Sequence, residues 1–159
     1  MKFKKIKSWA KVNLSLNVIK RLPNKHHQIE SLITFLQIYD EINIKKLDKN
    51  KHKISFSGKF SKGIDNNNTI FKLLKLLEKK KIIKDKKFEI KIKKNIPHKS
   101  GMGGGSMNAA SVLKYFIKKK IVMISNKKAI DLAYKVGSDV VLGLERKNSI
   151  LFKNGKIGR

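Results

Sequence analysis

A glycine-rich loop between a predicted strand and a predicted helix constrains this chain more than any other feature. The loop runs from Pro97 to Asn108 and contains four of the chain's ten glycines. Residues 88–93 alternate apolar and polar side chains before it, and residues 109–113 begin a helical pattern after it. Glycines let backbone N–H groups approach an anion closely, and a helix start adds free N–H donors and a positive dipole end. The sequence therefore predicts a phosphate-binding loop.

Two familiar phosphate loops do not match this one. The Walker pattern requires a lysine directly after its last glycine, whereas Ser106 follows Gly105 here. The dinucleotide-binding pattern requires a strand–helix–strand unit with a suitably placed acidic residue, and the sequence offers none. The loop is therefore of another kind. We expect its phosphate contacts to come from Pro97, His98, Lys99, Ser100, Gly101, Met102, Gly103, Gly104, Gly105, Ser106 and Met107.

Composition limits the classes of protein that this chain can represent. A length of 159 residues with 40% hydrophobic content suits one globular domain. No apolar run reaches about 18 residues, and none follows the basic start, so we expect neither a membrane span nor a secretory signal. The absence of cysteine excludes disulfides and thiolate metal sites and makes the cytoplasm the expected compartment. His26, His27, His52 and His98 lack metal-ligand spacing, so no protein-bound metal is expected.

The formal net charge of +28 invites a nucleic-acid interpretation. However, the lysines are spread over nearly every segment, beside many isoleucines and asparagines, and all three residue types are encoded by A/T-rich codons. Aromatic residues are not interleaved with the basic ones as a base-stacking surface requires. Compositional drift of the genome is therefore the favoured explanation of the charge, although such a surface would attract any polyanionic substrate.

Periodicity predicts strands mainly in the first half of the chain and helices mainly in the second. Val12, Leu14, Leu16 and Val18 fall on one face of a period-two strand, which a turn at 21–25 follows. Further strands are expected at 29–36, 42–47, 53–57 and 88–93, helices at 69–81, 106–119 and 127–136 with Asn68 and Asn126 as N-caps, and a hairpin at 149–159 turning at Asn154-Gly155. This order predicts an α+β fold with a mostly antiparallel sheet packed against helices.

Three other segments form a recognisable set with the glycine loop. In chain order, the set is Ser8–Leu16, Lys25–Leu32 with its continuation to Asp40, Pro97–Ala110 and Gly137–Val140. Together these segments resemble the motifs of the GHMP kinases. The resemblance is to the branch that phosphorylates the 2-hydroxyl of a cytidylyl-methylerythritol in the non-mevalonate route to isoprenoids. It covers residues 1–159 and implies one GHMP N-terminal domain that binds ATP, with Mg²⁺ carried by the nucleotide.

The resemblance also implies roles for four residues outside the loop. Asp139 would face the acceptor hydroxyl and abstract or orient its proton. Lys11 would neighbour Asp139, stabilise the ionised carboxylate and neutralise charge on the transferred phosphoryl group. Asn13, two residues further along a strand and so on the same face as Lys11, would contact the cytidylyl substrate. His27 would lie near its cytosine ring.

Departures from the family pattern leave alternatives open. Lys25-His26 replaces the usual Gly-Tyr, so another GHMP-type kinase with a different alcohol acceptor is one alternative. A basic RNA-binding module is another, because certain ribosomal-protein and ribonuclease domains share this layout. Family members also carry a C-terminal domain that we expect to be absent from these 159 residues. Whether the short chain is active by itself stays open.

Overall fold

Two long antiparallel strands run through the whole fold. β1 (Lys4–Arg21) and β2 (His27–Leu47) pair from Lys4 opposite Ile44 to Arg21 opposite His27.

The computed structural model of the chain describes residues 2–21, 27–65, 67–152 and 157–158, with the backbone alone at 21, 27–29 and 151. Most of the turn predicted at 21–25, and the turn predicted at Asn154-Gly155, lie outside the described residues.

β2 is one continuous strand where the sequence predicted two, at 29–36 and 42–47. Residues 37–41 contain no glycine or proline that would turn the chain, and Tyr39 and Asp40 pair with Trp9 and Ser8 of β1. The apolar alternation breaks at Asp40 because this carboxylate is buried among polar partners and not because the strand ends. The prediction of two separate strands was therefore wrong.

The remaining strands pair with different halves of β2. β4 (Lys87–Lys93) pairs antiparallel with residues 41–47, and β3 (Lys53–Ser57) pairs parallel with β4. β5 (Ser149–Leu151) pairs antiparallel with residues 31–33, and β6 (Ile157–Gly158) pairs antiparallel with β5. The sheet is therefore mixed but mostly antiparallel, as expected. The β3–β4 pair is parallel because helix α1 connects the two strands, which a tight turn cannot do.

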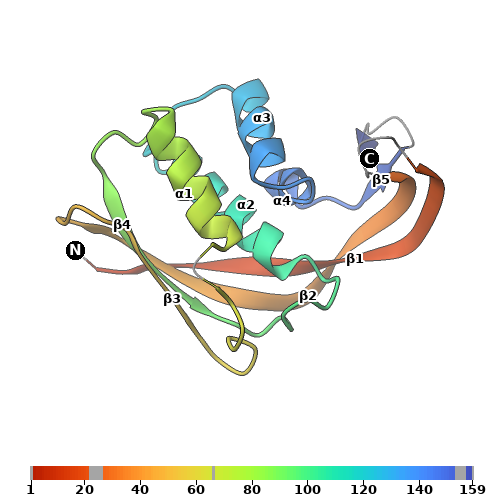
Figure 1. Cartoon of the computed structure of the whole chain (residues 1–159), viewed down its shortest axis with the longest axis horizontal. Helices are drawn as coiled ribbons and strands as arrows, with labels where there is room; N and C mark the ends of the chain where they lie inside the picture. Colours follow the sequence, from red (N-terminus) through yellow and green to blue (C-terminus); the bar gives the residue numbers. More distant parts are fainter. Residues whose placement is uncertain (1, 22–26, 66, 153–156, 159) are drawn as a thin grey trace.

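Helices cover one face of this sheet (Figure 1). They are α1 (Thr69–Lys79), α2 (Gly104–Lys118), α3 (Asn126–Val136) and α4 (Val140–Glu145). The chain is therefore an α+β fold, with the glycine loop leading from β4 into α2. None of the described helices combines the length and the apolar character that a membrane span needs.

The helix starts depend on capping residues that sequence predicted only in part. Asn68 caps α1 as predicted, since its side chain accepts a hydrogen bond from the backbone N–H of Phe71 at 3.0 Å. The N-cap of α3 is Ser125 and not Asn126, because the Ser125 hydroxyl accepts the Lys128 N–H at 3.3 Å. α2 begins two residues earlier than predicted, directly after the left-handed Gly103. The short helix α4 was not predicted.

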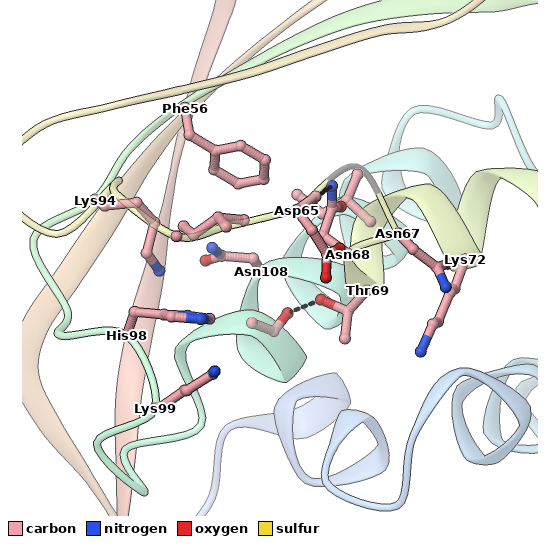
Figure 2. A pocket seen from close by; sticks show the side chains of 14 residues that line it. Phe56, Asp65, Asn67, Asn68, Thr69, Lys72, Lys94, His98, Lys99 and Asn108 are labelled. Atoms are coloured by element: carbon pink, nitrogen blue, oxygen red, sulfur yellow. Dashed lines mark hydrogen bonds between the residues drawn. The ribbon is translucent and has the colours of Figure 1, made fainter.

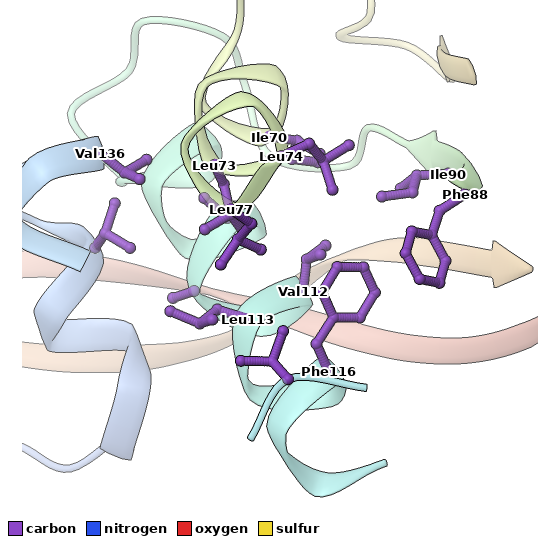
Figure 3. Packing of buried hydrophobic residues seen from close by; sticks show 14 of the residues in the cluster. Ile70, Leu73, Leu74, Leu77, Phe88, Ile90, Val112, Leu113, Phe116 and Val136 are labelled. Atoms are coloured by element: carbon purple, nitrogen blue, oxygen red, sulfur yellow. The ribbon is translucent and has the colours of Figure 1, made fainter. Parts of the chain in front are cut away.

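The main core lies between the sheet and helices α1 and α2. Leu73, Leu74 and Leu77 repeat at helical spacing on α1 and are buried against Leu113 and Phe116 of α2 (Figure 3). The inward side chains of β2 and β4 close this core from the sheet side: Ile42, Ile44, Phe88, Ile90 and Ile92. This packing fixes α2, and with it the end of the glycine loop, against the sheet.

The outer part of the β1–β2 hairpin carries apolar residues that are not buried. It curls toward β5 at the C-terminal side of the molecule (Figure 1). Leu14, Leu16 and Val18 keep 63%, 53% and 60% of their surface exposed. The register of β1 against β2 shifts between Asn13 and Ser15, so the prediction that Val12 shares one face with Leu16 was wrong. These exposed apolar side chains still form a surface that the described part of the chain does not cover.

Candidate active site

A buried lysine and a half-exposed carboxylate meet at the centre of the site. Lys11 lies in the middle of β1, and its Nζ is 3.0 Å from Oδ2 of Asp139. The Lys11 side chain is only 7% exposed, whereas that of Asp139 is 41% exposed. Lys11 Nζ also donates a hydrogen bond to Oδ1 of Asn13 at 2.9 Å. The Lys11 ammonium is therefore buried and held by Asn13, while the Asp139 carboxylate is partly accessible to solvent.

Asp139 reaches this position because two helices meet there. α3 ends at Val136, Gly137 follows it, and Asp139 precedes the first residue of α4. The backbone N–H of Val140 bonds to the carbonyl of Gly137 at 3.0 Å, which fixes the tight connection. Asp139 makes no capping bond to α4 with its side chain, so its carboxylate is free to pair with Lys11.

The glycine loop lies directly against the Lys11 side chain. The backbone N–H of Lys11 donates to the carbonyl of Met102 at 3.0 Å. Gly103 has a left-handed conformation with φ +66°, and a Cβ atom there would lie 2.8 Å from Cγ of Lys11. A residue without a side chain is therefore needed, both for the backbone conformation and for the close approach to the lysine.

The positive N-terminal end of α2 is not neutralised by a side chain of its own cap or first turn. No side chain caps the helix at Gly103, and its first turn contains no acidic residue. The first backbone N–H groups of an α-helix have no partner within the helix, and the helix dipole adds to their positive potential. The loop residues Gly103–Gly105 therefore present donors that suit a phosphate group.

A cavity of about 260 Å³ opens on the other side of the loop (Figure 2). Its lining includes Phe56, Asn68 and Thr69 on the side of β3 and α1, and Lys94, His98, Lys99, Gly105 and Asn108 on the side of the loop and α2. The hydroxyl of Thr69 donates to the carbonyl of Gly105 at 2.6 Å, which joins the start of α1 to the loop. Gly105 thus borders the cavity, while Gly103 touches Lys11.

The structure brings most of the predicted site residues together. Lys11 contacts both Asn13 and Asp139. Of the predicted loop residues, Gly103 lies against Lys11, and His98, Lys99 and Gly105 line the cavity. Ser100 shapes the loop itself, because its hydroxyl donates to the carbonyl of Pro97 at 2.9 Å. His27 lies in β2 opposite Arg21, but its side chain is outside the described part of the chain.

Sequence reasoning missed a buried polar cluster behind the loop. Asp40, Lys94 and Asn108 are 0%, 3% and 2% exposed, and Asp40 contacts both of the others. Lys94 was indistinguishable in sequence from the lysines around it. The signals that could have exposed the cluster are an aspartate in the middle of a strand and an asparagine among the buried residues that begin α2. Within the described residues, no group of three or more histidines and carboxylates could hold a metal ion.

Comparison with known proteins agrees with this geometry. The family model described as the GHMP kinases N terminal domain matches residues 68–146. The 4-diphosphocytidyl-2-C-methyl-D-erythritol kinase of Pelagibacter ubique (strain HTCC1062) is 52% identical over 153 residues, covering 96% of this chain and 54% of the relative. The enzyme of the same name from Francisella tularensis subsp. tularensis (strain SCHU S4 / Schu 4) is 33% identical over 149 residues, covering 94% of this chain and 54% of the relative.

Solved structures agree on the fold. A crystal structure of 4-(cytidine 5'-diphospho)-2C-methyl-D-erythritol kinase superposes with a TM-score of 0.73 at 23% identity, covering 92% of this chain and 51% of that one. Mevalonate kinase from Staphylococcus aureus MRSA252 superposes with a TM-score of 0.64 at 14% identity, covering 99% and 55%. The chain therefore spans about half the length of the curated relatives it matches.

Proposed function

Because the chain belongs to the GHMP kinase family, we propose that it provides the ATP-binding half of a small-molecule kinase. The observation that carries this proposal is the Lys11–Asp139 ion pair, which lies against a glycine loop at an uncapped helix start. Phosphoryl transfer needs positioning and charge stabilisation more than a strong base, and these groups supply both. ATP would enter as its Mg²⁺ complex.

We propose that one nucleotide lies across the loop. We assign its nucleoside to the cavity beside Thr69 and its phosphates to the backbone N–H groups at Gly103–Gly105. This arrangement directs the terminal phosphate across Gly103 toward Lys11. The Lys11 ammonium would then neutralise negative charge that develops on the transferred group.

The acceptor that we propose is 4-(cytidine 5'-diphospho)-2-C-methyl-D-erythritol, phosphorylated on its 2-hydroxyl in non-mevalonate isoprenoid biosynthesis. Support comes from the names of relatives that are 52% and 33% identical. The hydroxyl oxygen forms a bond to the γ-phosphorus while the bond from that phosphorus to the β–γ bridging oxygen breaks. Asp139 accepts the hydroxyl proton, and ADP leaves. Asn13 and His27 are the proposed contacts to the cytidylyl part, and the cytoplasm is the proposed compartment.

The curated relatives are about twice as long as these 159 residues. We propose that a second half, equivalent to the rest of the curated relatives, packs against the outer part of the β1–β2 hairpin. Support comes from the exposed apolar side chains of Leu14, Leu16 and Val18 and from the half-exposed Asp139. Exposed apolar side chains that gather on one segment indicate a contact surface.

Two measurements test this function. Isothermal titration of the chain with a non-hydrolysable ATP analogue tests the nucleotide site. A coupled ADP-release assay, with the chain joined to the remaining half of the Pelagibacter ubique relative, tests the transfer. Asp139→Asn should lower kcat by about 10²–10⁴-fold, and Lys11→Met by about 10²–10³-fold.

A matched control is available on the same strand. Lys5 also lies in β1 and pairs with Glu41 at 2.7 Å, but its side chain is 57% exposed and outside the site. Lys5→Met should therefore leave kcat within twofold of the parent. Unchanged turnover in Asp139→Asn would contradict the proposed mechanism, and absence of ATP-analogue binding would contradict the nucleotide site.

A further inference from the structure

One carboxylate behind the glycine loop collects four hydrogen-bond donors. Oδ1 of Asp40 accepts the backbone N–H groups of Asn95 and Ile96 at 2.8 and 2.9 Å. Its Oδ2 accepts the side-chain amide of Asn108 at 3.0 Å and pairs with the ammonium of Lys94. Asp40 itself is fully buried, so these groups replace all of its water contacts.

The four donors come from both ends of the loop. Asn95 and Ile96 follow β4 and lead into the loop, while Asn108 lies in the first turns of α2, beyond the glycines. Asp40 belongs to β2, which pairs with β1 and so with the strand that carries Lys11. This one carboxylate therefore fixes the start and the end of the loop to the same sheet that holds Lys11.

The Lys94 ammonium adds an electrostatic consequence. A Cβ atom built on Gly104 would lie 3.1 Å from Lys94 Nζ, so this buried cation lies against the first turn of α2. An unpaired buried ammonium is strongly unfavourable, and Asp40 compensates its charge. The pair keeps a positive group next to the phosphate-binding helix end without leaving it unpaired.

We propose that Asp40 is the positioning residue of the phosphate loop. It holds the backbone N–H groups of Gly103–Gly105 at the place where nucleotide phosphate binds, and it does so without touching the nucleotide. The proposal rests on the proposed nucleotide-binding function. We therefore expect that loss of the Asp40 carboxylate lowers nucleotide affinity more than a substitution elsewhere that destabilises the chain by the same amount.

Two substitutions at Asp40 separate its roles. Asp40→Asn keeps an oxygen for the two backbone N–H groups. Asn108 can turn its amide toward the new NH₂ group, since its Oδ1 has no hydrogen-bond partner among the described residues. Only Lys94 then loses its partner. Asp40→Ala removes every acceptor. We expect ATP-analogue affinity to fall at least tenfold in Asp40→Ala and by a smaller factor in Asp40→Asn, with partial rescue as the mark of positioning.

Glu78 provides the matched control, because it is a second carboxylate that joins separate elements far from the loop in sequence. It contacts His52 and Lys87, and neither residue lines the cavity. Glu78→Ala should lower the free energy of unfolding in urea while keeping ATP-analogue affinity within twofold. A folded Asp40→Ala variant that binds the analogue within twofold of the parent would overturn the proposal.

Hydrogen exchange gives a readout that does not need nucleotide. In Asp40→Ala, amides at 95–106 should exchange at least tenfold faster relative to those of α3, which shares none of the Asp40 contacts. Equal acceleration in both regions would reduce Asp40 to a general stability residue and overturn the proposal. A parent chain that binds no ATP analogue would reject the proposed function, while the exchange comparison would still decide the role of Asp40.

Discussion

At the scale of single residues, the site depends on a glycine that shares its space with a lysine. Gly103 combines a left-handed φ of +66° with a 2.8 Å approach of its would-be Cβ to Lys11 Cγ. Gly101 in the same loop has a similar φ of +75° but nothing within 4 Å of its would-be Cβ. The two positions therefore share the backbone requirement and differ only in the contact with Lys11.

Alanine substitutions at these two glycines should separate the cost of backbone strain from the cost of displacing the Lys11 side chain. Gly101→Ala should cost about 1–2 kcal/mol, the usual cost of a left-handed conformation for a residue with a side chain. Gly103→Ala should cost at least about 1 kcal/mol more, because its methyl group must also move the buried Lys11 stem. Urea unfolding of both variants measures the difference. Equal losses would mean that the loop moves away from Lys11 without cost.

The predictable site residues are those whose partners are close in sequence or belong to a motif. Lys11 and Asn13 could be placed together because residues two apart in a strand share a face. Asp40 and Lys94 are 54 positions apart, and their contact depends on the pairing of β2 with β4. Each of these two residues alone resembles an ordinary solvated side chain, so no local pattern could have shown that they contact each other.

At the scale of secondary-structure elements, periodicity predicted the buried faces well and the boundaries less well. α1 is recognisable because Ile70, Leu73, Leu74 and Leu77 all face the core. α4 was missed because its six residues follow α3 after a short connection and are too few to show a period. Its existence depends on packing against α2, which is a tertiary effect.

The start of β3, β4 and α1 meet at a half-buried histidine. His52 precedes β3, and its Nδ1 accepts the backbone N–H of Phe88 in β4 at 3.0 Å. Its Nε2 lies 3.1 Å from Oε1 of Glu78 in α1. Burial lowers the pKa of His52 below its usual value of 6.5, and Glu78 offsets this only in part. A protonated ring could not accept the Phe88 N–H, so the structure favours the neutral form.

The surroundings of His52 predict how the free energy of unfolding changes with pH. A histidine whose pKa is lowered by folding contributes stability that is present above its unfolded value, near 6.5, and lost as the pH falls below it. The free energy of unfolding, measured in urea, should therefore fall between pH 7.5 and 5.5. His52→Gln should flatten this slope. Burial raises the pKa of Glu78, but the hydrogen bond from Lys87 and the nearby His52 lower it below its usual 4.5, so this carboxyl titrates mainly below that range. An unchanged slope in His52→Gln would contradict the prediction.

At the scale of the whole molecule, the helices leave the outer part of the β1–β2 hairpin uncovered. α1–α4 protect one face of the sheet, but the β1–β2 hairpin extends beyond them (Figure 1). Its exposed Leu14 and Val18 lie on the strand that also carries Lys11 and Asn13. A second half bound to this hairpin would therefore also close the open side of the ion pair, where the acceptor is expected.

A polar replacement on the hairpin tests this assembly directly. Leu14 and Val18 are 63% and 60% exposed, so Leu14→Thr with Val18→Thr should change the stability of the chain alone by less than about 1 kcal/mol, since threonine also favours strands. Binding to the remaining half of the Pelagibacter ubique relative should weaken at least tenfold, because each side chain would lose about 1 kcal/mol or more of apolar burial. Titration calorimetry of the two halves measures this loss.

The matched surface residue for that experiment is Met123. It is 82% exposed and lies between α2 and α3, away from the hairpin in the sequence. Met123→Thr should therefore leave both the stability of the chain and its affinity for the second half unchanged. If the double hairpin variant and Met123→Thr bound the second half equally well, the outer part of the hairpin would not be the contact surface.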